Sequence, residues 1–242
     1  MHAWEAVQKS VDYIEEHLQE NIRAEALAEI IGLSPFYFQR LFKRLVNKPL
    51  QEYVKLRRLA KAVEALNTEN QRILDVALDY GFASHANFTR AFKGAFGITP
   101  EAYKKNRPFL NTFVKPEVSM AYVMVDENVP LIVGNIVLEI RRERIHAPEL
   151  YLGLSTDVSI IEQTPVGEST GVDIPGQLWK RYHQEKAAIE KYVQPNVELG
   201  MSYSANMEKG TFSYFAGGLA KTVPENLSGG FVQHELPAGE YI

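Results

Sequence analysis

The sequence of 242 residues contains no cysteine, which excludes disulfide bonds and thiolate metal sites within the chain. A chain without disulfide bonds fits a reducing compartment. No apolar run approaches the roughly 18 residues that are needed to span a bilayer. The N-terminal segment "MHAWEAVQKSVDYIEEHLQE" is charged throughout and lacks the apolar centre of a secretory signal peptide. These absences predict a cytoplasmic protein with no membrane partner.

The short motifs of common enzyme classes are also missing. The sequence has no glycine-rich phosphate loop, no HExxH motif and no cysteine nucleophile. Its histidines are scattered without metal-ligand spacing: His2, His17, His85, His146, His183 and His234. We therefore expect a protein that is not an enzyme and that holds neither a metal nor a cofactor.

Charge is divided unevenly along the chain. Residues 1–107 hold 16 Lys and Arg against 13 Asp and Glu, a net charge of +3, whereas residues 108–242 hold 10 against 17, a net charge of −7. Within 40–107 the balance is 14 basic to 6 acidic residues. The asymmetry predicts a basic module that meets a polyanion, attached to an acidic module with another task. With 45% apolar residues, the chain is long enough for two such domains.

The hydrophobic period changes near residue 107. Before it, apolar residues recur at steps of three and four, which predicts an all-α domain over 1–107. The expected helices are 4–18, 24–31, 35–46, 51–66, 73–80, 84–96 and a short one from Pro100. After a linker at 108–118, residues 119–242 predict an α+β domain with an antiparallel sheet. Its expected strands are 135–146, 151–156, 197–204, 211–218 and 230–242, with one helix at 176–192.

The helical domain contains an internal repeat. Gly32 matches Gly81 at an offset of 49. At an offset of 50, Phe38, Arg40, Phe42, Lys43, Tyr53 and Arg57 match Phe88, Arg90, Phe92, Lys93, Tyr103 and Arg107. Each copy reads as a short helix, a glycine turn and a second helix, which is the helix-turn-helix arrangement. The helix at 51–66 links the two copies.

The second helix of each copy, called the reading helix below, has two faces. The predicted core positions are Phe38, Leu41, Phe42 and Leu45 in the first copy, and Phe88, Ala91, Phe92 and Ala95 in the second. The predicted solvent positions are Phe36, Gln39, Arg40, Lys43 and Arg44, and His85, Ala86, Thr89, Arg90 and Lys93. Gln and Arg can read adenine and guanine in the major groove, and flanking Lys and Arg suit phosphates. A linking helix of 16–18 residues would be about 24–27 Å long, so one chain could meet two groove segments roughly one turn apart.

Some of these residues also have explanations that involve no DNA. A helix with Arg and Lys on one face is usually just solvated, although two such helices in a repeat favour DNA. Phe36 could pack under the N-terminal helix, and His85 could cap its own helix.

The two stretches "LAEIIGLSPFYFQRLFKRLVNKPLQEYVKLRRL" and "ILDVALDYGFASHANFTRAFKGAFGITPEAYKKNR" resemble the DNA-binding domain of the AraC/XylS family of transcription regulators. The first copy departs from the family pattern at Asn47, in place of glycine, and Leu50, in place of proline. The resemblance implies binding to duplex DNA and contact with RNA polymerase. It implies base contacts by Phe36, Gln39, Arg40, His85, Ala86, Thr89 and Arg90. The phosphate contacts that we expect are Lys43, Arg44, Arg57 and Lys93.

The acidic half is similar to the GyrI-like effector-binding domain, through "PGQLWKRY", "ELGMSY", "FSYFAGG" and "HELPAGEYI". That likeness implies a cleft for a small hydrophobic, often cationic, effector. The candidate lining residues are Trp179, Tyr182, Tyr203, Tyr214 and Phe215, with Glu162 or Glu198 as possible charges. The alternatives are plain core packing for these side chains, a C-terminal domain that hydrolyses a small molecule, and an architectural DNA-binding protein without a ligand.

In that family a second repeat continues after the "PAGEYI" turn, whereas this sequence stops at Ile242. We therefore expect an incomplete effector domain. Its first repeat, from about Asn135 to Gly218, would leave an unpaired sheet edge. Self-association through the C-terminal half, or poor order of that half, is the expected consequence.

Overall fold

The computed structural model describes residues 3–68, 71–118, 127–133, 136–159, 170–206, 208–224, 226–227 and 229–241. It divides into two compact units, Met1–Val123 with Thr164–Val172, and Met124–Gln163 with Asp173–Ile242. These bounds differ from the predicted ones, because the segment 108–118 belongs to the first unit and is no free linker. Phe113 and Val118 are buried in the core of that unit, which explains the difference.

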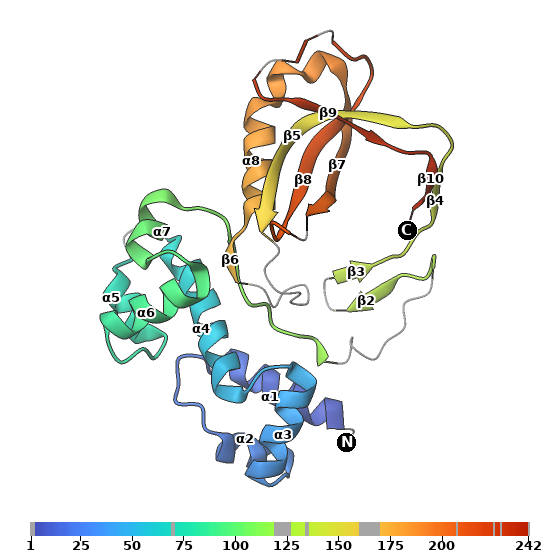
Figure 1. The fold of residues 1–242 in the computed structure, drawn as a ribbon. Helices are drawn as coiled ribbons and strands as arrows, with labels where there is room; N and C mark the ends of the chain where they lie inside the picture. Colours follow the sequence, from blue (N-terminus) through green and yellow to red (C-terminus); the bar gives the residue numbers. More distant parts are fainter. Residues whose placement is uncertain are drawn as a thin grey trace. The chain divides into compact units, whose positions relative to one another are not determined.

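The first unit is a chain of helices in the predicted order (Figure 1). The N-terminal helix ends at Glu16, before the predicted Leu18, and the other bounds agree closely with the sequence analysis. A short strand pair, β1 (Leu110–Asn111) with β6 (Gly171–Val172), completes the unit. The helices are α1 (Ala3–Glu16), α2 (Ala24–Ile31), α3 (Pro35–Val46), α4 (Leu50–Leu66), α5 (Ile73–Asp79), α6 (His85–Phe96) and α7 (Pro100–Asn106). No helix in the described ranges is both long enough and apolar enough to cross a membrane.

Helix α4 contributes to two separate hydrophobic clusters. Its N-terminal half, through Leu50, Tyr53 and Val54, packs with α1, α2 and α3. Its C-terminal half, through residues such as Leu59 and Leu66, packs with α5, α6 and α7. The two helix-turn-helix copies therefore share one helix as their common support.

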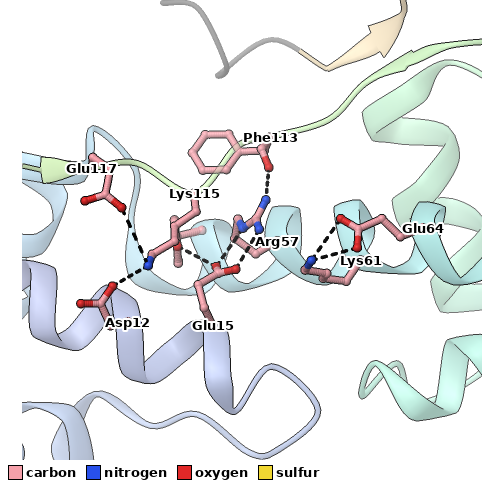
Figure 2. A network of polar contacts seen from close by, with 9 residues as sticks. Asp12, Glu15, Arg57, Lys61, Glu64, Phe113, Lys115 and Glu117 are labelled. Carbon is pink, nitrogen blue, oxygen red and sulfur yellow. Dashed lines mark hydrogen bonds and ion pairs between the residues drawn. The ribbon is translucent and has the colours of Figure 1, made fainter. Parts of the chain in front are cut away.

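A polar clamp fixes α4 against α1 (Figure 2). The Arg57 guanidinium donates from Nε and Nη2 to the two carboxylate oxygens of Glu15, each at 2.8 Å, and from Nη1 to the Phe113 carbonyl. The Tyr53 hydroxyl donates to Glu15 Oε1 at 2.8 Å. Burial, reinforced by the Glu15 charge, raises the pKa of Tyr53, so this phenol stays a donor. The prediction that Arg57 contacts phosphate is wrong, because Arg57 is only 8% exposed and each of its three guanidinium nitrogens already donates a hydrogen bond within the unit.

The second copy contains a weaker version of the same clamp. Tyr103 and Arg107, the repeat partners of Tyr53 and Arg57, both meet Asn67 at the end of α4. The Tyr103 hydroxyl donates to Asn67 Oδ1 at 2.8 Å, and Arg107 Nη1 donates to the Asn67 carbonyl at 3.4 Å. An amide thus stands where the first copy has a carboxylate, so only the first clamp is an ion pair.

Arg58 joins the two copies at one further point. Its guanidinium donates to the carbonyls of Leu18 and Glu20, at 2.8 and 2.6 Å, in the loop between α1 and α2. The same guanidinium lies against the glycine turn of the second copy, where a Cβ added at Gly81 would come within 2.9 Å of Arg58 Nη1. Gly81 therefore serves both the turn and this close approach.

The second unit is built on an antiparallel sheet, as predicted. Its strand order is β7-β8-β5-β9, formed by Val193–Asn206, Thr211–Ala220, Glu149–Ser159 and Val232–Leu236. Helix α8 (Ile174–Glu185) packs on one face, where Leu178 and Tyr182 join Leu152, Leu154 and Ala216 in a cluster. Two smaller antiparallel pairs are β2 (Leu131–Val133) with β3 (Ile136–Leu138), and β4 (Glu143–Ile145) with β10 (Gly239–Tyr241).

Three elements of this unit differ from the predicted ones. The expected strand 135–146 is divided into β3 and β4, and the expected strand 230–242 into β9 and β10, which Pro237 separates. The expected helix 176–192 ends at Glu185 and continues as two 3-10 turns, Lys186–Ala188 and Glu190–Tyr192. These tighter turns bury Ile189 and lead directly into β7. The expected self-association of this half stays a prediction.

Replacing Arg57 with methionine should destabilise the first unit by about 3 kcal/mol, because the Glu15 carboxylate would lose its partner in a nearly buried site. Denaturant unfolding followed by helix circular dichroism measures the change. The matched control is Arg72→Met, which removes the exposed Arg72–Asp75 pair at the start of α5 and should cost under about 0.5 kcal/mol. Equal losses for the two variants would contradict the structural role of the clamp.

Candidate nucleic-acid interface

The two helix-turn-helix copies have the same turn geometry. Gly32 and Gly81 adopt left-handed backbone angles, with φ of 70° and 72°. Each reading helix, α3 or α6, begins after a serine whose hydroxyl accepts a backbone N–H. Ser34 accepts from Tyr37 at 3.3 Å, and Ser84 accepts from Asn87 at 3.2 Å. The glycine reverses the chain without a side-chain clash, and the serine satisfies one free donor of the helix start.

The turn after each reading helix is also the same, despite the sequence departures. Asn47 and Gly97 both end their helices in the left-handed region, with φ of 62° and 75°. Asparagine tolerates this region better than most residues, so it replaces glycine here at small cost. Leu50 and Pro100 are both buried at the first position of the next helix. The departures at Asn47 and Leu50 therefore leave the local fold intact.

The reading helices present the predicted faces to solvent. Phe38 and Phe42 in α3, and Phe88 and Phe92 in α6, are completely buried. The predicted core residues Leu41, Leu45, Ala91 and Ala95 are half-buried, and the next turn adds Val46 and Phe96 to the core. The exposed residues are Phe36, Gln39, Arg40, Lys43 and Arg44 on α3, and His85, Ala86, Arg90 and Lys93 on α6.

Phe36 projects into solvent at the start of α3. Its side chain is 71% exposed, so it does not pack under the N-terminal helix. The Arg40 guanidinium carbon lies 5.6 Å from the centroid of the Phe36 ring. This is a cation–π contact, which holds the planar guanidinium of Arg40 near the exposed ring.

Two predicted base contacts of α6 need correction in detail. Thr89 is half-buried, and its Oγ1 is buried without a hydrogen-bond partner, so the hydroxyl is not offered to a base. His85 does not cap its helix, because Ser84 occupies that position. Instead, His85 Nε2 lies 3.0 Å from Glu101 Oε1 of α7. The carboxylate beside His85 would oppose a nearby phosphate.

Three of the four predicted phosphate contacts keep an accessible charge. Lys43, Arg44 and Lys93 are exposed, and none of them forms an ion pair with another described residue. Two further exposed residues of the reading helices are not among the predicted contacts: Tyr37, which is 52% exposed in the first turn of α3, and its repeat partner Asn87 in α6. The offset of 50 aligns these two positions and could have revealed them.

The predicted effector residues do not form one cluster. Trp179, Tyr182 and Tyr214 lie on the sheet face that α8 covers, where Trp179 Nε1 donates to the Tyr214 hydroxyl at 3.1 Å. Phe215 and Tyr203 belong to the opposite face. The reason is the alternation of β8, which points consecutive side chains to opposite sides of the sheet. A single cleft lined by all five is therefore wrong.

The two predicted acidic partners have different outcomes. Glu198 is already engaged, because Lys186 Nζ lies 3.0 Å from its Oε1 and His183 Nε2 lies 3.5 Å from its Oε2. Glu162 lies outside the described residues.

Comparison with known proteins places the likeness in the first unit. Residues 27–106 match a family model described as a helix-turn-helix domain. YbfP of Bacillus subtilis (strain 168), an uncharacterized HTH-type transcriptional regulator, is 41% identical over 113 residues, which cover 47% of this chain and 37% of YbfP. The probable transcription factor PqrA of Proteus vulgaris is 42% identical over 96 residues, 39% of this chain and 79% of PqrA. The regulatory protein SoxS of Salmonella typhimurium is 34% identical over 98 residues, 40% of this chain and 92% of SoxS.

Among solved structures, the DNA-binding domain of AdpA in complex with a target DNA is 27% identical, with a TM-score of 0.39, and covers 41% of this chain and 90% of that one. The chain spans well under two thirds of YbfP but most of PqrA and SoxS. Since PqrA and SoxS are each more than 30% identical over most of their own lengths, this chain belongs to the AraC/XylS family of transcription regulators.

Proposed function

We propose that the chain is a sequence-specific transcription regulator that reads two adjacent major-groove segments of duplex DNA, one with α3 and one with α6. The observation that carries this proposal is the repeated exposed face: Arg40 and Arg90 lie at the same position on two reading helices that are each supported by a fully buried phenylalanine row. Helix α4, with 17 residues, is about 25 Å long and supports both copies.

The exposed side chains divide into groups with distinct roles. Arg40 and Arg90 have the planar donors that pair with guanine O6 and N7, and Gln39 can pair with adenine. Phe36 and Ala86 are apolar and suit thymine methyl groups. Thr89 would offer its methyl group, because its hydroxyl is buried. His85, which is paired with Glu101, would act at the margin of the contact.

Lys43, Arg44 and Lys93 are placed to neutralise phosphates. Such contacts release condensed counterions, so the affinity falls as salt rises, independently of the sequence bound. Arg57 takes no part, because it is occupied in the clamp. As a transcription regulator, the protein would have RNA polymerase as its further partner.

The acidic second unit is proposed to sense a small hydrophobic or cationic effector on the sheet face away from α8. The Tyr203 and His234 rings lie 4.5 Å apart there, and those of Phe215 and His234 lie 5.4 Å apart. Asp157 is exposed on β5 and accepts a hydrogen bond from Ser213, which lies opposite Tyr203 in the sheet register. Aromatic faces beside a carboxylate are suited to an organic cation.

Replacing Arg40 or Arg90 with alanine should relax the preference at one base position, and each change should cost roughly 1–3 kcal/mol on the preferred site. Lys43→Ala and Lys93→Ala should weaken binding to all sequences alike and reduce the salt slope by about one unit. Selection from random duplex DNA, followed by fluorescence anisotropy at several salt concentrations, separates the two effects.

The control for this series is Lys9→Ala, an exposed lysine of α1 outside both reading helices. It should leave the selected sequence and the salt slope unchanged. If the arginine variants weakened every sequence equally while the lysine variants altered base preference, the roles assigned to the two groups would be wrong.

The effector proposal predicts a difference between two half-buried tyrosines of the β7–β8 hairpin. Tyr203→Leu should weaken binding of the probe benzyltrimethylammonium about fivefold, because a cation–π contact contributes about 1 kcal/mol. Tyr214→Leu, on the opposite face, should leave the affinity unchanged. Isothermal titration calorimetry on the full chain measures both. Loss of binding in Tyr214→Leu alone would place the effector on the α8 side and refute the assignment.

A further inference from the structure

The second unit contains a cavity of about 260 Å³ where the edge strand β7 separates from β8. It lies at the end of α8, on the side of the sheet opposite to the aromatic face discussed above, and all of its lining residues belong to the second unit. The lining residues are Tyr182, Lys186, Glu190, Val193, Gln194, Pro195, Asn196, Glu198 and Lys221.

An enlarged bulge in β7 opens this cavity. Val193 pairs with Ala220, and the next registered pair is Glu198 with Gly218, so residues 194–197 stand opposite Leu219 alone. Asn196 takes a left-handed backbone angle, with φ of 62°, which lets the strand loop outward. Bulges are frequent beside functional sites, where they direct side chains away from the regular ladder.

The Tyr182 hydroxyl lies in the cavity wall and has no hydrogen-bond partner among the described residues. Tyr182 as a whole is 1% exposed. Gly218 leaves the space for it, because a Cβ there would come within 2.8 Å of the Tyr182 hydroxyl oxygen. Burial and the nearby Glu198 charge raise the pKa of Tyr182 to about 12, so the group remains a donor. Among the described residues, the one buried side-chain polar atom without a partner is Thr89 Oγ1, so the Tyr182 hydroxyl is accessible from the cavity and is placed to donate to a molecule bound there.

The charges of the lining are only partly paired with each other. Glu198 is engaged by Lys186, at 3.0 Å, and approached by His183, at 3.5 Å. In contrast, Lys221 and Glu190 are exposed at the rim of the cavity, and neither forms an ion pair with any residue that the structure describes. The cavity wall therefore has one cation and one anion without an ion-pair partner, and one hydroxyl without a hydrogen-bond partner, among the described residues.

We propose that this cavity binds a small zwitterion, an α-amino acid, whose carboxylate meets Lys221 and the Tyr182 hydroxyl and whose ammonium group meets Glu190. A simple anion would leave Glu190 without a partner, and a simple cation would leave Lys221 and Tyr182 without one. The volume lies below the range of about 300–1,000 Å³ typical for drug-sized ligands, which favours a molecule of this size. The site is separate from the DNA interface and from the aromatic face, and its test does not depend on either.

The test uses the full chain and a panel of the free α-amino acids, screened by saturation-transfer NMR and measured by isothermal titration calorimetry. At least one amino acid should bind, and its N-acetyl and its amide derivative, each lacking one charge, should bind at least tenfold more weakly. Tyr182→Phe removes only the hydroxyl and should weaken binding about tenfold, and Lys221→Met should weaken it at least as much. Lys209→Met, in the turn at the far end of the β7–β8 hairpin, should leave it unchanged.

Three results would overturn the proposal. One is that no amino acid binds the folded chain. Another is that an amino acid binds Tyr182→Phe and Lys221→Met as tightly as the unaltered chain, which would place its site elsewhere. The third is that the neutralised derivatives bind as well as the parent zwitterion. DNA binding, measured on the same samples, reports separately on the function proposed for the first unit.

Discussion

The ion pair between Arg57 and Glu15 is the interaction on which the DNA-reading unit depends. It joins the middle of α4 to the end of α1, and Tyr53 and the Phe113 carbonyl complete its hydrogen bonds. Because α4 supports both helix-turn-helix copies, its attachment to α1 determines how firmly the first copy is held on the shared helix. A charged residue is an unusual core element, and here each of its three guanidinium nitrogens donates to a fixed oxygen acceptor.

Much of the first unit could be predicted because its signals are local. The three- and four-residue spacing of Phe38 and Phe42, the serine before each reading helix and the glycine in each turn are sufficient to define the helices and their faces. Because the two copies align at an offset of 50, a helix or face predicted in one copy can be checked against the same positions of the other. Arg57 shows what the sequence alone does not reveal. Its charge and its place in the repeat are also those expected of a phosphate-binding residue, and only its ion pair with Glu15 of α1 shows that its role is structural.

The second unit was harder to predict because its organisation depends on long-range pairing. Period-two alternation identified β5, β7 and β8, but which face each aromatic residue occupies follows from the sheet register, which a single sequence does not contain. Tyr214 and Phe215 are adjacent in sequence and lie on opposite sides of the sheet for this reason. The bulge at 194–197, which opens the polar cavity, likewise has no sequence signal beyond Pro195 and Asn196.

We propose that one chain reads two segments of DNA. The most direct test is a hydroxyl-radical footprint of the full chain on a selected duplex, combined with native mass spectrometry of the same complex. We predict one chain per duplex, with protection flanking two major-groove segments about 10 base pairs apart, the spacing of one helical turn. Protection of a single segment by one chain, or of two segments only when two chains are bound, would contradict it.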